Sequence, residues 1–132
     1  MATEKVVIDA SAAVQASLSN GWKALGPWRL VAPSLLWSES AAGIAQLEFR
    51  REITAADAKA ALERLLEAVV ESHDSRDLIL EAHVLARQLG WAKTYDAEFV
   101  VLARKLGTRL LTVDARLAAT AARFVRVIGM ER

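Results

Sequence analysis

Four acidic residues stand at positions where their carboxylates could share one site. Asp9 and Asp114 each follow a short apolar run typical of a buried strand, and each precedes a predicted helix. Glu39 and Asp96 lie within the first turns of two other predicted helices. The carboxyl ends of parallel strands and the helices that begin there meet at one edge of a sheet, where open α/β folds place their sites. We therefore predict that these four carboxylates gather at one edge.

A cluster of this kind implies a cation. Carboxylates within a few ångströms repel one another and raise one another's pKa unless a cation holds them. The chain has no cysteine, and both histidines, His73 and His83, lie in segments away from the four acids. The donors are therefore hard oxygens, which favour Mg²⁺ or Mn²⁺ over zinc. A carboxylate-held ion of this type serves to bind a phosphodiester, activate a water for in-line attack and neutralise the leaving oxygen.

Each acid taken alone also has a structural explanation. Asp9 and Asp114 fit the N-cap position of the helix that follows them. Asp96 in a first helical turn complements the helix dipole, and the Glu39 side chain could simply face water. These structural roles remain open beside the metal-binding one.

Two hydroxyl residues are candidates for supporting roles. Ser11 and Thr112 stand two residues from Asp9 and Asp114, respectively. At that spacing each hydroxyl can orient a carboxylate, or it can cap the local backbone. Both alternatives stay open at the level of the sequence.

The elements that would position these residues alternate between strands and helices. The predicted strands span residues 6–8, 29–32, 110–113 and 124–128, and the predicted helices span residues 11–18, 33–49, 55–70, 77–89, 95–106 and 115–122. Such alternation requires a parallel sheet with helices on both faces. We predict an α/β fold with a mainly parallel central sheet.

Local signals set the expected helix boundaries. Pro33 suits the first turn of its helix, and Thr54 and Thr94 are predicted N-caps. Gly90 and Gly107 are predicted to end their helices. The apolar stripe of the helix after Thr54 is expected to comprise Ala58, Ala61, Leu62, Leu65, Leu66 and Val69.

Composition excludes several classes of protein. The 132 residues, 54% hydrophobic and 25% charged, suit one packed domain over residues 1–132. No stretch approaches the roughly 20 apolar residues of a membrane span, and the first residues lack a secretory apolar region, so we expect a cytoplasmic protein. A net charge of +1 gives no strong basic field, although basic residues are concentrated in the last third of the chain.

Three segments, VVIDASAAV, PSLLWSES and YDAEFVVLARKLGTRLLTVDARLA, resemble the PIN-domain ribonucleases in order and spacing. The similarity spans nearly the whole chain, and its last segment is the most specific. Within that family the chain resembles the VapC-type toxins of toxin–antitoxin pairs. The resemblance implies an α/β/α sandwich, an Mg²⁺ or Mn²⁺ site, endonucleolytic cleavage of RNA and inhibition by a cognate antitoxin.

The same resemblance implies roles for individual residues. The metal-site acids would be Asp9 in IDAS, Glu39 in SES, Asp96 in YDA and Asp114 in TVD. Ser11 and Thr112 would be their supporting hydroxyls.

The resemblance further implies a homodimer and an antitoxin segment buried in a groove near the active site. Four tryptophans are available either as aromatic anchors in such a groove or as core residues: Trp22, Trp28, Trp37 and Trp91. Lys93 and Arg116 lie near predicted ligands, where each could contact RNA phosphates or simply face solvent.

Three other classes of protein compete with this interpretation. A phosphoacceptor receiver domain also binds Mg²⁺ through clustered acids, but it resembles this chain less because a single Asp9 is followed by Ala10. A phosphatase of the haloacid dehalogenase type would need Asp-x-Asp after the first strand, where this chain has Ser11. The third alternative is a PIN-like module that binds an antitoxin without turnover, which only an activity assay separates from a nuclease.

Overall fold

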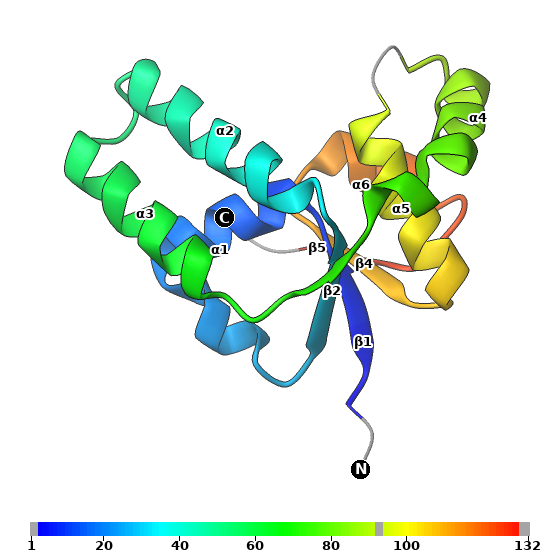
Figure 1. Ribbon diagram of the computed structural model, residues 1–132, viewed down its shortest axis with the longest axis horizontal. Helices are drawn as coiled ribbons and strands as arrows, with labels where there is room; N and C mark the ends of the chain where they lie inside the picture. The colour runs from blue at the N-terminus through cyan, green and yellow to red at the C-terminus, as the bar shows by residue number, and fades with distance from the viewer. Residues whose placement is uncertain (1–2, 92–93, 130–132) are drawn as a thin grey trace.

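A five-stranded parallel sheet forms the centre of the molecule (Figure 1). The computed structural model describes residues 3–91 and 94–129. The strand order is β3-β2-β1-β4-β5, with β1 at Lys5–Ile8, β2 at Arg29–Pro33, β3 at Glu71–His73, β4 at Arg109–Thr112 and β5 at Val127–Gly129. The predicted parallel sheet is confirmed. Because the chain moves outward in opposite directions from β1 and β4, the strand order reverses between these two strands, and a crevice is expected at their carboxyl ends.

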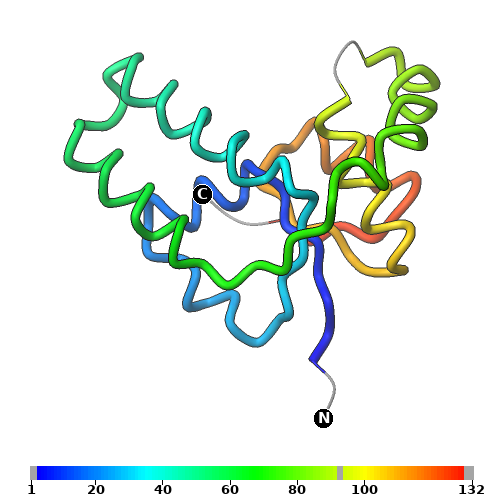
Figure 2. The backbone as a smooth tube through the Cα atoms, in the orientation of Figure 1, coloured from blue at the N-terminus to red at the C-terminus, as the bar shows by residue number. Residues whose placement is uncertain are grey.

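Helices cover both faces of the sheet, which confirms the predicted α/β/α sandwich. One side carries α1 (Ala10–Ser19), α2 (Leu36–Phe49) and α3 (Ala55–Glu67), and the other carries α4 (Ile79–Leu89), α5 (Tyr95–Leu106) and α6 (Ala115–Ala121) (Figure 1). The tube in Figure 2 shows α2 and α3 as an antiparallel hairpin that extends beyond the sheet. Among the described helices, none combines the length and the apolar character needed to cross a membrane.

The core explains why the two central strands are so apolar. Val6, Val7 and Ile8 of β1 and Leu110 and Leu111 of β4 are all fully buried, because helices cover the sheet on both faces. Helix α5 packs against the sheet and against α4, and its residues 97–103 are buried without interruption. The strand ends that carry the acids are therefore held by a tightly packed core.

The predicted helix start at Pro33 is wrong. Pro33 is the last residue of β2, and α2 begins only at Leu36. The backbone N–H of Ser34 donates a hydrogen bond to the carbonyl of His73 at 2.7 Å, so pairing with β3 keeps the chain extended past the proline. At the end of a strand the missing proline N–H costs little pairing.

The segment after α3 also differs from the prediction. Helix α3 ends at Glu67 instead of residue 70, and the chain then enters β3, a polar edge strand that the sequence did not predict. As a result Val69, expected on the buried stripe, is 91% exposed. Leu66, also expected on that stripe, lies within α3 but is exposed as well. The short strand ESH has no apolar alternation, so its pattern gave no strand signal.

Most helix boundaries follow the predicted caps. Thr54 and Asp57 form a capping box, and Gly90 and Gly107 end their helices with φ of 71° and 65°. Thr94 occupies the N-cap of α5, but its side chain makes no capping hydrogen bond with any described residue. Two elements begin later than predicted. Helix α4 begins at Ile79, after a 3₁₀ turn over Ser75–Asp77. Strand β5 begins at Val127, because the chain still turns after α6.

Candidate active site

Asp9 is the most firmly held of the four acids. It is 3% exposed and lies directly after β1. Its Oδ1 accepts hydrogen bonds from the backbone N–H of Ala12 at 2.9 Å and from Ser11 Oγ at 2.8 Å, and its Oδ2 accepts one from Thr112 Oγ1 at 2.6 Å. Asp9 therefore caps α1, as one interpretation predicted, and the same carboxylate is fixed against β4.

The hydroxyls of Ser11 and Thr112 join the ends of the two central strands. Their oxygens lie 3.1 Å apart. Ser11 Oγ accepts from the backbone N–H of Val113 at 3.1 Å, and Thr112 Oγ1 accepts from that of Asp114 at 3.0 Å. The hydroxyl pair thus connects the Asp9 carboxylate to the backbone that carries Asp114.

Asp114 is the N-cap of α6. Its Oδ1 accepts from the backbone N–H groups of Arg116 at 2.9 Å and Leu117 at 3.1 Å. No described residue donates a hydrogen bond to its second oxygen, Oδ2. The capping role therefore leaves one carboxylate oxygen of Asp114 for another partner.

Glu39 and Asp96 approach the same strand ends from opposite sides of the sheet. Glu39 lies in the first turn of α2 and Asp96 in the first turn of α5, and both side chains are half-buried. Among the described residues, the buried Oε2 of Glu39 has no hydrogen-bond partner. A buried carboxylate oxygen without a donor is costly, so this atom favours a cation as its partner.

Charge interactions connect the four carboxylates. Burial raises the pKa of Glu39 to about 7, helped by the charges of Asp96, Asp9 and Glu98. Burial also raises the pKa of Asp9 to about 6, although its hydrogen bonds oppose the rise and Asp96 adds to it. The pKa of Asp96 is raised by burial and then by Asp114. Asp96 thus interacts with all three of the other acids.

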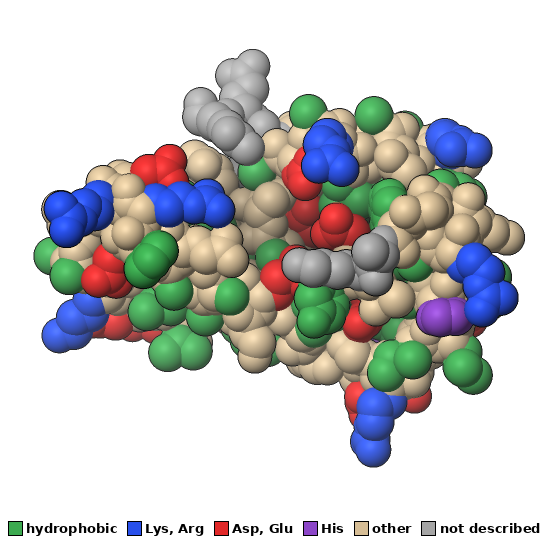
Figure 3. All heavy atoms as spheres, turned by 90° about the horizontal axis from the view of Figure 1, so that it is seen from above, with side chains coloured by type: hydrophobic (Ala, Val, Ile, Leu, Met, Phe, Trp, Pro, Cys, Tyr) green, Lys and Arg blue, Asp and Glu red, His purple; other side chains and the backbone are tan. Residues whose placement is uncertain are grey.

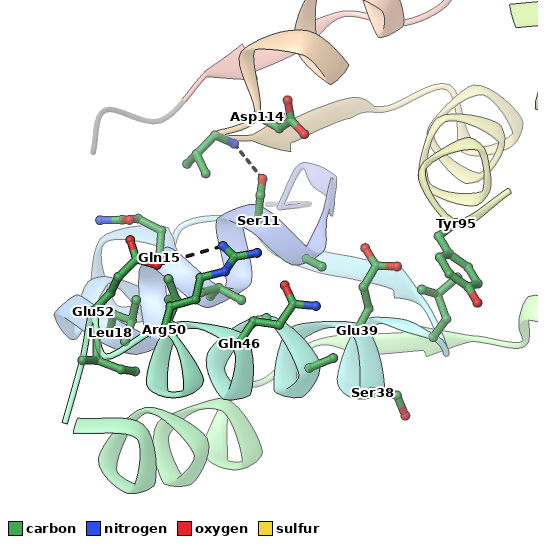
Figure 4. Close-up of a pocket in the computed structure, with 18 residues that line it drawn as sticks. Ser11, Gln15, Leu18, Ser38, Glu39, Gln46, Arg50, Glu52, Tyr95 and Asp114 are labelled. Carbon is green, nitrogen blue, oxygen red and sulfur yellow. Dashed lines mark hydrogen bonds and ion pairs between the residues drawn. The ribbon is translucent and has the colours of Figure 1, made fainter. Parts of the chain in front are cut away.

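A groove leads away from this cluster. Figure 3 shows acidic side chains gathered in a hollow between the helices of the two sides. The groove has a volume of about 1050 Å³ and runs between α1 and α2. Glu39, Asp114 and Tyr95 lie at one end, and Arg50 and Glu52 lie at the other (Figure 4).

The donor set fits a hard divalent cation. All the candidate ligands are carboxylate oxygens, and the unpartnered oxygen of Glu39 lies among them. Within residues 3–91 and 94–129, no three acidic or histidine side chains stand close enough to hold one ion as they are placed. Binding therefore requires side-chain rotation, for which the half-buried Glu39 and Asp96 have more freedom than Asp9.

The remaining residues considered in the sequence are Lys93, Arg116 and the four tryptophans. Lys93 lies outside the described residues. Arg116 is exposed in the first turn of α6, and its positive charge lowers the pKa of Asp96, against the larger rise from burial. Arg116 therefore lies beside the acids. The four tryptophans pack partly buried against the core, and in the described part of the chain none lines the groove.

Two residues near the site were missed in the sequence. Tyr95 is 53% exposed and lines the groove beside Glu39, where an aromatic ring can stack on a base. Its position next to Asp96 was the available signal. Glu98, two residues after Asp96, is almost fully buried, which helical spacing alone does not predict.

Thr112 offers a test of how far the hydroxyl pair supports the site. We expect Thr112→Val, which keeps the shape and removes the hydroxyl, to weaken Mn²⁺ binding about 10- to 100-fold, because it releases both Asp9 and the Asp114 backbone. Calorimetric titration with Mn²⁺ measures this effect. Thr120→Val, on α6 and away from the acids, is the matched control, and equal affinities in both variants would contradict the proposed support.

Comparisons with solved structures support the fold. The architecture is that of PIN domains: a structure from Pyrobaculum aerophilum matches with a TM-score of 0.71 at 20% identity over 95% of this chain and 90% of that one. A PilT N-terminus domain protein of Sulfolobus solfataricus matches with a TM-score of 0.50 at 17% identity over 95% and 86%. A VapBC2 complex of Rickettsia felis, bound to a promoter DNA fragment, matches with a TM-score of 0.61 at 12% identity over 96% and 99%.

Sequence relatives identify the family within this fold. The ribonuclease VapC9 of Mycobacterium tuberculosis is 34% identical over 117 residues, which cover 87% of this chain and 90% of the relative. A VapC ribonuclease of Mycobacterium bovis has the same identity and coverage. No protein-family model matches the chain. At this identity and coverage, the chain belongs to the VapC ribonuclease family.

Proposed function

We propose that the protein is a metal-dependent endoribonuclease and the toxin component of a type II toxin–antitoxin system. The observation that carries this proposal is the set of four carboxylates at the point where the strand order reverses, Asp9, Glu39, Asp96 and Asp114, in which the charge of Asp96 interacts with each of the other three. Family membership supplies the reaction class. It also argues against the receiver-like alternative, because the relatives are ribonucleases.

Different residues of the chain have different roles in such a reaction. When bound, Mg²⁺ or Mn²⁺ supplies charge stabilisation at the phosphate and activation of a water nucleophile. Asp9, fixed by Ser11 and Thr112, provides a rigid ligand, whereas the unpartnered oxygen of Glu39 is free to rotate toward the ion. Arg116, exposed beside Asp96, places a positive charge where a phosphate would approach.

Direct assay of cleavage tests this function. Antitoxin-free protein is incubated with total cellular RNA in Mg²⁺ or Mn²⁺, beside a sample with EDTA. Discrete fragments that disappear with EDTA and return when the metal is restored support the proposal. Intact RNA with a folded, metal-loaded protein would instead favour the silent antitoxin-binding module.

We also propose that the groove between α1 and α2 holds a segment of the cognate antitoxin. Its walls combine apolar and polar side chains, with charged residues at both ends, and it opens on the acids, so an occupant would cover the active site. The lining side chains include Val14, Leu18, Leu35, Leu47 and Ile53.

A pair of alanines on α2 tests the location of that segment. Ala42 lines the groove, whereas Ala45 is exposed on the same helix outside it. We expect Ala42→Arg to weaken antitoxin binding by at least about tenfold, because the new side chain fills the groove with a charge. Ala45→Arg should bind as the wild type does. Equal binding of both variants in a pull-down titration with the co-expressed antitoxin would place the antitoxin elsewhere.

The homodimer and the cytoplasmic location are also proposals. An exposed apolar surface on α4 supports self-association: Leu80 is 83% exposed, and Ile79 and Val84 are about half exposed. Sedimentation of the purified protein measures the oligomeric state. Cellular RNA, the proposed substrate, supports a cytoplasmic site of action.

A further inference from the structure

Tyr95 is an exposed aromatic residue beside the acids. It is the first residue of α5, directly before Asp96, and it is 53% exposed. Seven large apolar side chains are strongly exposed in the part of the chain that the structure describes, and only Tyr95 among them lines the groove. Ligand sites are typically concave and use open aromatic surfaces of this kind, so the position of the ring calls for a ligand.

Two residues from α2 complete the same end of the groove. The carbonyl of Leu35 accepts a hydrogen bond from the backbone N–H of Glu39 at 3.0 Å, so the two residues are one helical turn apart and share one face of the helix. Both line the groove, and Figure 4 shows Glu39 and Tyr95 at the same end of it. An aromatic ring and an aliphatic side chain therefore lie beside an acid of the proposed metal site.

These surfaces suit a nucleobase. A base is planar, has π faces and carries no charge, so it gains from stacking on an aromatic ring, and carboxylates nearby do not repel it as they repel a phosphate. In an RNA chain a single sugar separates each base from its phosphate. A phosphate held at the acids therefore brings its flanking bases into the surroundings in which the Tyr95 ring lies.

We propose that Tyr95 forms a base-binding subsite, in which the base on one side of the cleaved bond stacks on the ring. Inside an A-form duplex each base is paired and stacked between its neighbours, so the subsite requires a base that has left the stack. The substrate class is therefore RNA with an unpaired nucleotide at the bond that is cut. This inference rests on the proposed function, because it concerns RNA at that same site.

The test measures RNA binding separately from cleavage. The probe is a short, fluorescently labelled single-stranded RNA that spans a bond cut by the wild-type protein, and its anisotropy is followed with Ca²⁺ in place of Mg²⁺, with the RNA checked to be intact afterwards. Tyr95→Ala removes the ring, and Tyr95→Phe keeps it. Phe49→Ala is the matched control, because Phe49 is 89% exposed at the end of α2 and does not line the groove.

We expect Tyr95→Ala to raise the dissociation constant of the RNA about 5- to 100-fold, and Tyr95→Phe to stay within about twofold of the wild type. Phe49→Ala should bind the RNA normally. The Mn²⁺ affinity should be the same in Tyr95→Ala and in the wild type, because the ring holds no ion. Annealing the RNA to its complement should weaken its binding to the wild type, because a paired base cannot reach the ring.

Two abasic RNAs identify the contact itself. Each lacks the base on one side of the cut bond. One of them should bind the wild type as weakly as the intact RNA binds Tyr95→Ala. That RNA should lose nothing further with Tyr95→Ala, because the change in the RNA and the change in the protein remove the same stack.

Several results would overturn the subsite. They include unchanged RNA affinity in Tyr95→Ala, and losses that add in full for both abasic RNAs. An equal loss in Tyr95→Phe would assign the effect to the hydroxyl, and a weaker Mn²⁺ affinity in Tyr95→Ala would assign it to Asp96. If Tyr95→Ala weakens the antitoxin complex and leaves RNA binding unchanged, the ring is an antitoxin contact instead.

Failure of the proposed function is distinguishable from failure of the subsite. A folded wild-type protein that cuts no RNA would overturn the proposed function, and this inference with it, before any variant is compared. A wild-type protein that cuts RNA, with a Tyr95→Ala variant that binds the probe equally well, would overturn the subsite alone.

Discussion

Replacing Asp96 with asparagine is expected to lower RNA cleavage by about three orders of magnitude and to raise the melting temperature of the metal-free protein by about 3 °C. Both effects have one cause. The Asp96 carboxylate is half-buried and interacts unfavourably with Asp9, Glu39 and Asp114, so its charge costs stability until a cation is bound. Asparagine keeps the volume and removes the charge. Cleavage assays and thermal unfolding in EDTA measure the two changes.

An exposed acid provides the control for this variant. Asp77, in the 3₁₀ turn before α4, is exposed, and its replacement by asparagine should leave both cleavage and melting temperature unchanged. A lower melting temperature in Asp96→Asn would show that the residue mainly complements the dipole of α5. Undiminished cleavage by that variant would remove Asp96 from the mechanism.

Acidification is expected to weaken Mn²⁺ binding steeply, because the ion must displace protons from the ligands. A proton on Glu39, whose pKa is about 7, weakens the apparent affinity about 50-fold between pH 7 and pH 5. A proton on Asp9, whose pKa is about 6, adds about another tenfold over the same range. Mn²⁺ titrations at several pH values measure the slope. Glu39→Gln should show only the smaller dependence, and an affinity that does not change from pH 7 to pH 5 would contradict both assignments.

The same raised pKa values fix how the metal-free protein responds to pH. Glu39 and Asp9 have pKa values above their ordinary ones of 4.5 and 3.8, so these two side chains bind more protons in the folded chain than in the unfolded chain between about pH 4 and pH 7. The free energy of unfolding in EDTA therefore falls as the pH rises through that window. Addition of Mn²⁺ above pH 7 should restore it.

Much of the fold could be predicted because strong local patterns agree with the tertiary structure. The apolar runs before Asp9 and Asp114 are buried on both faces, as a parallel sheet requires, and Gly90 and Gly107 end their helices as predicted. The elements that were predicted wrongly depend instead on pairing between strands that are far apart in the sequence. Strand β3 exists only because β2 offers it an edge, and the extended backbone at Pro33 depends on the same pairing.

The candidate site, too, could be predicted where it depends on topology and could not be predicted where it depends on long-range contacts. The four acids could be predicted to share one edge because topology alone brings strand ends and helix starts together. The sequence offered capping and ligation as alternatives for Asp9, whereas the structure shows that the cap leaves the carboxylate within the acidic cluster. The burial of Glu98 could not be predicted in this way, because it depends on how α5 packs against the sheet and α4, which no local pattern encodes.

The most direct test of the central claim is a crystal structure of the protein soaked in Mn²⁺, with an anomalous difference map recorded near the manganese absorption edge. We expect a peak among the carboxylates of Asp9, Glu39, Asp96 and Asp114, with the Glu39 side chain rotated toward it. A map in which Mn²⁺ binds away from these residues, or in which crystals of active enzyme show no peak there, would contradict the assignment of the four acids as the metal site.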